Sequence, residues 1–421
     1  MARIALRPFI DLLPYRIDQA LIGQGLRGWR VRRRRSKLSG HAAPRGNGSG
    51  ARHLYIDLAV ISRDDAGTGI QRVVRGLALA LLNETGSQWD VRFVSAFRRS
   101  AYHLISWPNG AMLKKAEIRG RPGDVFLGLD FSLDAVRRHR QQLAQFKQDG
   151  GALWFLVCDL LPVQRPEWFS PNNVIRYKAW LEVIAGIADG FFCISPQTQA
   201  ELATVMKDRF GLSSGYHSVV IPMGHDIMQS VPSGRIEHRD LHGRPELNAP
   251  FTLIVGTLEP RKGHADILAA YSELWRKGAS DRLVLVGRMG WRVGDLREQI
   301  LSHPEFGKKL LWLDDVDDDE LELIYQGSQG VIIASLAEGF GLPLIEALGY
   351  RKPVLARDLP IFRQHEKLGV RYFPANGGPT AVAAAIASWI EDIRAGGIAV
   401  TAPSSSWQDA TQTILDALQS G

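Results

Sequence analysis

Strand-like and helix-like segments alternate along most of this chain, and that alternation restricts the fold more than any other feature. Short runs rich in β-branched and aromatic residues, such as YIDLAVI at 55–61 and FTLIV at 251–255, are separated by longer amphipathic segments. Runs of this kind are typical of parallel strands that are covered by helices on both faces. The alternation therefore predicts an α/β protein built on doubly wound parallel sheets.

The alternation runs twice, and a segment of different composition separates the two halves. Residues 232–250 are rich in proline, glycine and charge, which is typical of a linker. A chain of 421 residues also exceeds what one hydrophobic core usually serves. We expect two Rossmann-like domains facing across a cleft, the first at 51–235 and the second at 251–400, with a linker at 236–250 and a closing segment at 401–421.

Residues 1–50 form a basic leader. They carry 11 Lys and Arg against 2 Asp, whereas the rest of the chain carries 40 basic and 42 acidic side chains. The net charge of +7 therefore belongs to the leader, and nucleic acid is not an expected partner of the folded body. Three interpretations of the leader remain open: a solvated, partly disordered tail, attachment to an anionic membrane surface through Trp29 and Arg32 to Arg35, or nucleic-acid binding.

The location of the protein is predicted from what the chain lacks. No apolar stretch of the leader approaches the roughly 20 residues that a membrane-spanning helix needs. The two cysteines, Cys158 and Cys193, lie inside apolar runs, so a disulfide framework is not expected. We expect a cytoplasmic protein, with peripheral attachment to the inner face of the membrane as an added possibility.

The segment AEGFGLPLIEA at 337–347 places two carboxylates around a glycine-rich turn. It follows a short buried-strand pattern, GVIIAS at 330–335, and Pro343 suits the first turn of a helix. Glu338 then lies in the loop and Glu346 on the helix, whose N-terminal amides favour anions. A ligand with paired hydroxyls and phosphates, such as a sugar joined to a nucleoside diphosphate, would satisfy both kinds of group.

Two more strand-end loops favour an anionic ligand with a flat ring. In GTLEPRKGH at 256–264, Arg261 and Lys262 stand near the start of the next helix, where cations oppose the helix dipole and are expected to face an anion. In GRMGW at 287–291, Gly287 and Gly290 are expected to leave room for a ring.

A third loop, DDVDDDEL at 314–321, has the acidity of a metal site. Asp317 with Glu320 three residues later has the spacing of a helix capping box, however. We expect capping and a solvated face there, with no metal and no cofactor.

Residues 250–375 resemble the donor domain of the retaining glycosyltransferases of family 4, also called group 1, which have the GT-B fold. The matching segments are GTLEPRKGH, the E-x7-E motif from Glu338 to Glu346, and ALGYRKPVLARDLPIFR at 347–363. YIDLAVISRDDAGTGIQRVVR at 55–75 and CDLLPVQRPEWF at 158–169 resemble a mannosyltransferase-like branch of the family. The segment SSWQDATQTILDAL at 405–418 resembles the closing helix that packs back on the first domain.

The resemblance implies a role for each matched donor-side residue. Glu338 would bond hydroxyls of the donor sugar and Glu346 those of the ribose, while Arg261 and Lys262 would hold the diphosphate and stabilise the leaving group. The further donor-binding positions that it implies are Gly256, Thr257, Gly287, Gly339, Phe340, Gly341 and Leu342.

The first domain would supply the acceptor side. The residues implied to cap the phosphates or shape the acceptor pocket are Gly67, Thr68, Gly69, Gln71 and Arg72. Asp159 and Arg165 would line the acceptor side, and Asp159 joins the catalytic candidates, although a strand-end cap is the alternative role. Cys158 stands where the family often has histidine, so that role is not carried over.

These expectations combine into a retaining, metal-independent hexosyltransferase. It would move mannose from GDP-mannose, or a related deoxyhexose, to a glycan or lipid-linked glycan acceptor in surface polysaccharide assembly. The alternatives are a UDP- or dTDP-sugar donor, a nucleotide-sugar epimerase or hydrolase of the same fold, and a non-catalytic binding protein.

Overall fold

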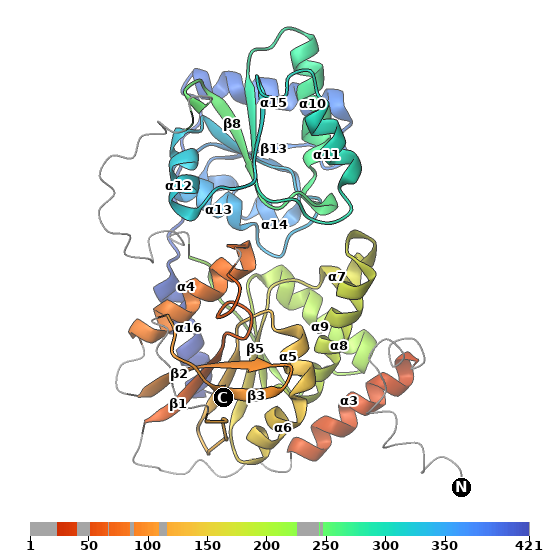
Figure 1. The fold of residues 1–421 in the computed structure, drawn as a ribbon, viewed down its shortest axis with the longest axis vertical. Coiled ribbons are helices and arrows are strands. Elements are labelled where there is room, and N and C mark those ends of the chain that lie inside the picture. Colours follow the sequence, from red (N-terminus) through yellow and green to blue (C-terminus); the bar gives the residue numbers. More distant parts are fainter. Residues whose placement is uncertain are drawn as a thin grey trace. The chain divides into compact units, whose positions relative to one another are not determined.

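The computed structural model describes residues 23–39, 51–65, 67–84, 88–108, 116–224, 244 and 247–420. The chain divides into two compact units (Figure 1). The first unit comprises residues 1–65, 80–221 and 411–421, and the second comprises residues 66–79 and 222–410. Much of the predicted leader and most of the predicted linker lie outside the described residues.

The first unit is built on a seven-stranded sheet. Its strands lie side by side in the order β3 (Ser100–Leu104), β2 (Trp89–Phe97), β1 (Arg52–Asp57), β4 (Val125–Gly128), β5 (Ala152–Val157), β6 (Gly190–Cys193) and β7 (His217–Val220). Neighbouring strands are parallel except for the antiparallel pair β2 and β3. The strand order reverses between β1 and β4, which makes their carboxyl ends the switch point of this sheet.

Helices cover this sheet as the alternation predicts. They are α3 (Gln24–Ser39), α4 (Gly69–Glu84), α5 (Leu133–Arg138), α6 (Arg140–Gln148), α7 (Leu161–Gln164), α8 (Pro171–Ile187) and α9 (Pro196–Phe210). Serine side chains cap α8 and α9, since Ser170 and Ser195 accept from amides of the first helical turn. The α4 helix begins in the second unit and ends in the first.

The second unit is built on a six-stranded, wholly parallel sheet. Its strand order is β10 (Leu310–Leu313), β9 (Arg282–Val286), β8 (Phe251–Val255), β11 (Gly330–Ile333), β12 (Val354–Arg357) and β13 (Val370–Phe373). The helices between the strands are α10 (His264–Arg276), α11 (Gly294–Leu301), α12 (Asp318–Gly327), α13 (Leu342–Gly349), α14 (Pro360–Arg363) and α15 (Pro379–Arg394). Here the switch point lies between β8 and β11.

The prediction of two doubly wound, Rossmann-like sheets is confirmed. The strand patterns at 55–61, 251–255 and 330–335 overlap β1, β8 and β11, whereas β3 was not predicted because an antiparallel edge strand lies outside the strand–helix alternation. The last helix, α16 (Trp407–Ser420), joins the first unit from Thr411 onwards.

Part of the basic leader is a folded helix and not a tail. The α3 helix packs against α8 and α9, and its Val31 and Leu38 are buried in the core of the first unit. The boundary predicted at residue 50 therefore marks a change of composition, while the structure places residues 24–39 in the first unit.

Candidate active site

Glu338 lies between two cations at the carboxyl end of β11. The Lys262 Nζ is 2.5 Å from Glu338 Oε1, and the Arg261 Nη1 is 3.3 Å from Oε2. The Ser335 hydroxyl donates a third hydrogen bond, at 2.7 Å, to Oε1. The side chain is 11% exposed, so this ion-paired cluster is largely shielded from bulk water.

The cations decide the charge of this carboxylate. Burial alone would raise the pKa of Glu338, but the nearby charges of Lys262 and Arg261 outweigh it and lower the pKa to about 2. Glu338 is therefore an anion at any physiological pH, able to accept hydrogen bonds and unable to donate them.

The two cations precede a helix and face carboxylates of the protein. Arg261 and Lys262 lie in a 3-10 turn, Pro260–Lys262, that leads into α10. Besides Glu338, Arg261 binds the buried Glu259, with Nη2 2.7 Å from Oε1. The sequence predicted that these cations face an anion, and in this structure the anions are glutamates of neighbouring loops.

A glycine turn brings the next helix close to Glu338. Gly341 has a φ of +95°, and a side chain there would meet the ring of Phe362 at 2.6 Å, so only glycine fits. Gly341 is the N-cap of α13, and Pro343 occupies its first turn. The amides of this turn, from Gly339 to Leu342, lie at the N-terminus of a helix, where backbone donors and the helix dipole favour an anion.

Glu346 occupies α13 in a different setting. It is 1% exposed, and the Tyr325 hydroxyl donates a 2.7 Å hydrogen bond to its Oε2. The Arg72 guanidinium is 3.1 Å from Oε1, and the ring of Tyr325 stacks on Tyr350. The residue predicted to bind ribose hydroxyls is thus hydrogen-bonded through Oε2, whereas its buried Oε1 has an ion-pair contact with Arg72 but accepts no hydrogen bond from a described residue.

The segment 66–79, expected in the first domain, groups with the second unit. Thr68 and Gln71 form a capping box at the start of α4: the Thr68 amide donates to Gln71 Oε1 and the Gln71 amide donates to Thr68 Oγ1. Gly69 approaches Leu342, and the Arg75 guanidinium is 2.9 Å from Asp318. These contacts bring Arg72 and the donor-side helix α13 into one cluster.

Gly287 and Gly290 lie where two loops of the second unit pack closely together. A Cβ at Gly287 would lie 2.1 Å from the Gly256 carbonyl oxygen, and one at Gly290 would lie 2.5 Å from that of Leu258. The loops after β8 and β9 therefore pack backbone against backbone at these glycines. A side chain at either position would therefore clash with backbone, while the expectation that these loops leave room for a flat ring stays a prediction.

The first-unit residues of the predicted acceptor side have structural contacts of their own. Asp159 Oδ1 accepts from the Leu161 amide at 3.1 Å, which is the strand-end cap foreseen as its alternative role. Arg165 is exposed, and its guanidinium lies 5.4 Å from the centre of the Trp168 ring. Burial, with a smaller effect of the Asp159 charge, raises the pKa of the Cys158 thiol, so the thiol stays protonated at neutral pH.

The acidic cluster after β10 caps a helix, as predicted. Asp317 Oδ1 accepts from the Glu320 amide at 2.8 Å and is the N-cap of α12. Arg244 binds Glu320 at 2.6 Å and Asp315 at 3.0 Å. Within the described part of the chain, no group of three or more His, Cys, Asp or Glu could hold a metal ion.

Sequence reasoning missed several residues that build this site: Glu259, Ser335, Tyr325, Arg357 and His264. The buried Arg357 at the end of β12 donates to the Ala334 carbonyl at 2.9 Å and binds Asp266 at 2.5 Å, so it joins the loop before Glu338 to α10. His264 is buried beside Lys262; burial, with a smaller effect of that charge, lowers its pKa to about 3 and keeps its ring neutral. Glu259 lies in the loop after the strand pattern at 251–255 and Ser335 ends the pattern at 330–335, so strand-end position was the available signal for these two.

The chain also lacks a spanning helix in the part that the structure describes: no described helix is long and apolar enough to cross a membrane.

Comparison with known proteins supports the resemblance seen in the sequence. Residues 238–395 match the family model described as glycosyl transferases group 1. The serotype-specific mannosyltransferase WbdA of Escherichia coli is 34% identical over 348 residues, covering 80% of this chain and 43% of WbdA. The O-antigen chain mannosyltransferase RfbU of Salmonella typhimurium is 26% identical over 122 residues, covering 29% of this chain and 33% of RfbU. The chain thus spans less than half the length of these relatives.

Solved structures give the same architecture. HepE of Anabaena, crystallised with UDP and glucose, covers 88% of this chain with all of its own, at 17% identity and a TM-score of 0.56. Sucrose-phosphate synthase of Thermosynechococcus elongatus covers 88% of this chain and 94% of its own, at 16% identity and a TM-score of 0.53. These likenesses confirm the GT-B fold. Residues 238–395 therefore form a glycosyltransferase group 1 domain, and the predicted resemblance of the chain to the mannosyltransferase-like branch of that family is confirmed.

Proposed function

We propose that this protein is a retaining glycosyltransferase that moves a hexose from a nucleotide sugar to a glycan or lipid-linked glycan without a metal ion. GDP-mannose is the favoured donor, because the relatives that cover most of the chain are named mannosyltransferases. Surface polysaccharide assembly is the favoured setting, since two shorter matches are named O-antigen chain mannosyltransferases.

One observation carries the proposal: Glu338, Lys262 and Arg261 form a charged cluster beside the N-terminus of α13. An ammonium group has three N–H donors, so Lys262 can bond Glu338 with one and keep two for phosphate oxygens. Glu338, held as an anion, accepts from sugar hydroxyls. The adjacent first turn of α13 adds backbone donors for the diphosphate.

In the proposed reaction, the bond between the anomeric carbon and the diphosphate oxygen breaks while a bond to the acceptor hydroxyl forms on the same face. The departing phosphate oxygen takes the proton of that hydroxyl. Arg261 and Lys262 stabilise the negative charge that develops on the leaving group, which is the electrostatic contribution usually largest in such reactions. Because two cations and a helix N-terminus can stabilise that negative charge, the proposed reaction needs no metal for this purpose.

Ribose recognition at Glu346 requires a local change. Its Oε1 lies 3.1 Å from the Arg72 guanidinium without accepting a hydrogen bond from it, and its Oε2 accepts from the Tyr325 hydroxyl. We propose that the donor's ribose hydroxyls replace the Arg72 guanidinium at Oε1, while the Tyr325 hydroxyl remains at Oε2 and fixes the carboxylate. Arg72 is then available to a phosphate, the role that its sequence motif predicted.

We also place the protein on the cytoplasmic side of a membrane, where a lipid-linked acceptor would be presented. The basic residues of the N-terminal segment support peripheral attachment to that surface.

Thermal unfolding with GDP, UDP, dTDP and ADP in turn tests the donor class. A nucleotide at about 100 times its Kd adds about 2.7 kcal/mol of stability, which should raise Tm by several degrees if the second unit limits unfolding. We expect GDP to raise Tm in wild type and to lose most of that effect in Glu346→Gln. Glu391→Gln, the same substitution on the exposed face of α15, is the matched control and should keep the full shift.

The other outcomes separate the alternatives. A shift with UDP or dTDP only would keep the transferase and overturn GDP-mannose as donor. Consumption of GDP-mannose at an undiminished rate without any acceptor would favour an epimerase or hydrolase. A non-catalytic protein that has kept the fold would be favoured if Glu338→Gln and Lys262→Met both left unchanged whatever activity the protein supports.

A further inference from the structure

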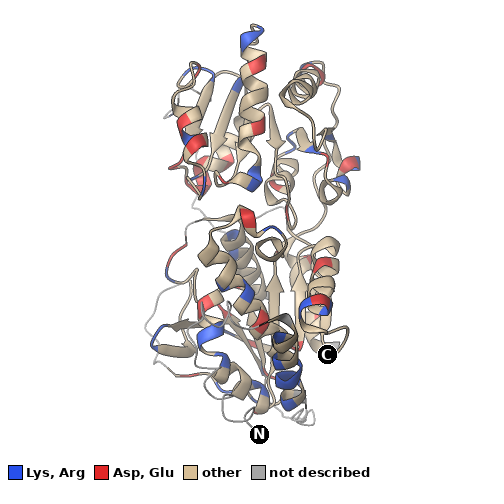
Figure 2. Cartoon of the chain, turned by 90° about the vertical axis from the view of Figure 1, so that its right-hand side faces the viewer, with Lys and Arg blue, Asp and Glu red and all other residues tan. Residues whose placement is uncertain are grey.

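Helix α3 carries a concentration of positive charge on the first unit. Its sixteen residues, QGLRGWRVRRRRSKLS, contain six arginines, one lysine and no acidic residue. Figure 2 shows Lys and Arg gathered on the side of the first unit that carries α3 in Figure 1. Val31 and Leu38 fix one side of the helix in the core. We call the side chains that contact α8, α9 and neighbouring segments the inner face, and those on the side opposite the core the outer face.

The inner arginines hold the helix in place. Arg27 and Arg30 each lie 3.9 Å from the carboxylate of Glu182 on α8. Arg32 donates to the carbonyl of Phe210, the last residue of α9, at 2.7 Å, and Arg35 donates to the carbonyls of neighbouring segments. These contacts make α3 an integral element of the first unit with a defined orientation.

Like charges lie close together where α3 meets the rest of the first unit. Burial lowers the pKa of Lys178, and the like charges of Arg209 and Arg27 lower it further. The pKa of Arg209 is likewise lowered by burial and by Arg27, and only Glu182 opposes this. Mutual repulsion of this kind is relieved when an anionic surface comes close.

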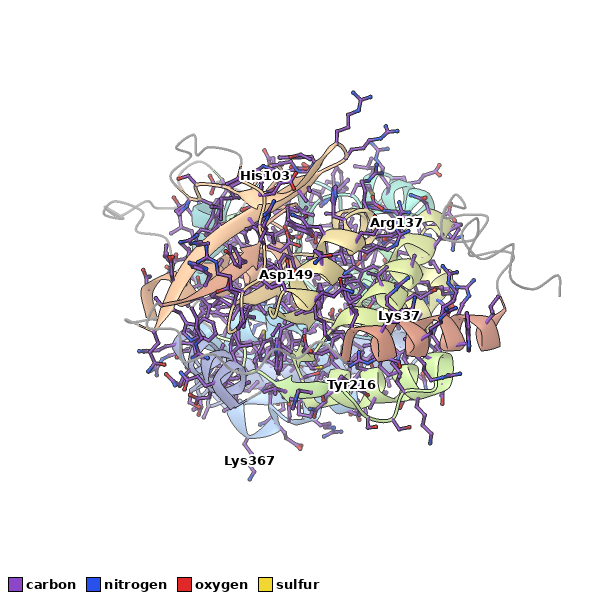
Figure 3. The ribbon with its side chains drawn as sticks, turned by 90° about the horizontal axis from the view of Figure 1, so that it is seen from below. Lys37, His103, Arg137, Asp149, Tyr216 and Lys367 are labelled. Carbon is purple, nitrogen blue, oxygen red and sulfur yellow. The ribbon has the colours of Figure 1, made fainter. Side chains whose placement is uncertain are left out.

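The outer face of α3 combines apolar and basic side chains. Leu26 is 46% exposed and Trp29 38% exposed, and Arg33 and Lys37 follow on the same side of the helix, three or four residues apart. The Arg33 guanidinium lies 5.1 Å from the centre of the Trp29 ring. Among the described residues, neither Arg33 nor Lys37 has a carboxylate within ion-pair distance. In Figure 3, α3 lies on the outside of the first unit, with Lys37 labelled.

We propose that the outer face of α3, formed by Leu26, Trp29, Arg33 and Lys37, binds the surface of a membrane that contains anionic lipids. Tryptophan and leucine partition into the interface between headgroups and acyl chains, while arginine and lysine bind headgroup phosphates. A nucleic acid would use the cations but would have no need of an exposed leucine beside them. The proposal rests on the membrane location given above and is independent of the donor and the reaction.

Sedimentation of the full chain with vesicles tests this surface. The vesicles are phosphatidylcholine alone, or phosphatidylcholine with 30% phosphatidylglycerol, in about 50 mM and about 500 mM salt, chosen because screening lengths shorten with salt. We expect wild type to bind only the anionic vesicles, and to bind less at high salt. The double variant Arg33→Gln/Lys37→Gln should bind roughly 30-fold more weakly, because each basic residue near such a surface contributes about a factor of five.

Trp29→Ala separates lipid insertion from simple charge attraction. It should weaken vesicle binding at both salt concentrations, because it removes the apolar contribution. The matched control is Arg98→Gln/Arg99→Gln, which removes the same charge from the exposed turn between β2 and β3 and should leave binding unchanged. Thermal unfolding of each variant confirms that it is folded.

Three outcomes would overturn the proposal: equal binding of wild type and the Arg33/Lys37 double variant, an equal loss in the Arg98/Arg99 control, or binding to neutral vesicles as strong as to anionic ones. If Trp29→Ala left vesicle binding unchanged, and wild type bound a DNA oligonucleotide more tightly than it bound anionic vesicles, the surface would be assigned to nucleic acid instead. Because no donor or acceptor is present, failure here leaves the proposed transferase reaction untouched.

Discussion

The two sheets reverse their strand order in the same way, yet the carboxylates at the two switch points are treated differently. In the first unit, Asp57 ends β1 and Asp130 follows β4. In the second unit, Glu338 follows β11, and the cations that bind it follow β8. Both pairs of strands end where open α/β sheets usually bind ligands.

Neutral donors surround the first-unit carboxylates. Asp57 accepts from the Ala59 amide and the Tyr102 hydroxyl at 2.9 Å, and from the Ser132 hydroxyl at 2.5 Å. Asp130 accepts from backbone amides of the loop after β1. Burial and the charge of Asp130 raise the pKa of Asp57 to about 7.

The contrast with Glu338 teaches that the partners, and not the architecture, set the charge of a switch point. Burial acts on Asp57 and Glu338 in the same direction, but two cations reverse its effect on Glu338. Asp57 uses its oxygens in hydrogen bonds to the Ala59 amide and to two hydroxyls, which is a structural role. Glu338 remains charged beside two cations, as a site for a polar, anionic ligand requires.

The largest expected effect comes from removing the charge of Glu338. Glu338→Gln keeps the size of the side chain and one acceptor oxygen, but it loses the negative charge and the second acceptor oxygen and leaves Lys262 less well positioned. We expect transfer from GDP-mannose to a mannose-terminated oligosaccharide to fall roughly 10³-fold, the scale seen when one preorganised electrostatic group is lost. Asp57→Asn should lower the same transfer rate far less. Equal losses in the two variants would contradict the contrast between the two switch points.

The pH dependence of stability should separate the two carboxyls in opposite directions. The folded pKa of Asp57, about 7, lies above its ordinary value near 3.8, so its favourable contribution is complete below pH 4 and is lost as the pH rises towards 7. The loss amounts to at most roughly 4 kcal/mol. Asp57→Asn should flatten the fall in the free energy of unfolding between pH 4 and 7, as measured by urea titration at each pH.

Glu338 should act at lower pH. Its folded pKa of about 2 lies below its ordinary value, so its contribution is present above pH 4.5 and is lost as the pH falls towards 2. Glu338→Gln should therefore reduce the loss of stability at acid pH. It should leave the slope of the free energy of unfolding between pH 4 and 7 unchanged. A wild type whose stability does not fall between pH 4 and 7 would contradict the raised pKa of Asp57.

Tyr325→Phe sharpens the comparison within the second unit. It removes only the hydroxyl that donates to Glu346 Oε2, so the buried carboxylate loses one hydrogen bond. We expect roughly tenfold weaker GDP binding, because a hydrogen bond to a charged group contributes about 1.5–3 kcal/mol and part of this is recovered by rearrangement. Isothermal titration measures it, and Tyr350→Phe is the control on the stacked neighbour.

The smallest expected effect concerns the acidic cluster after β10. Asp317→Ala removes the N-cap of α12 and should cost about 1 kcal/mol of stability. Turnover should be unchanged by this variant and by a chelator, since capping and not metal binding is the role of the cluster. A large loss with chelator that Mg²⁺ restores would contradict this and would place a third kind of carboxylate at a strand end.

The sequence alone determined the architecture and the donor-side motif. Alternation of apolar runs with amphipathic segments predicted two doubly wound parallel sheets, because buried strands and covering helices have distinct periodicities. The E-x7-E spacing placed Glu338 on a loop and Glu346 on the following helix, as observed. The pairing of Asp317 with Glu320 was also readable, because helix capping is local in sequence.

Only the tertiary structure decided which distant groups meet. The cations of Arg261 and Lys262 meet Glu338 across some 76 residues, and Arg72 meets Glu346 across the chain, although each residue alone resembled a ligand contact. The opposite charge states of Asp57 and Glu338, the packing of Gly287 on Gly256 and the docking of α3 follow from the same cause. Local sequence sets which element a residue joins, whereas burial and partner charge depend on atoms that only folding brings within a few ångströms.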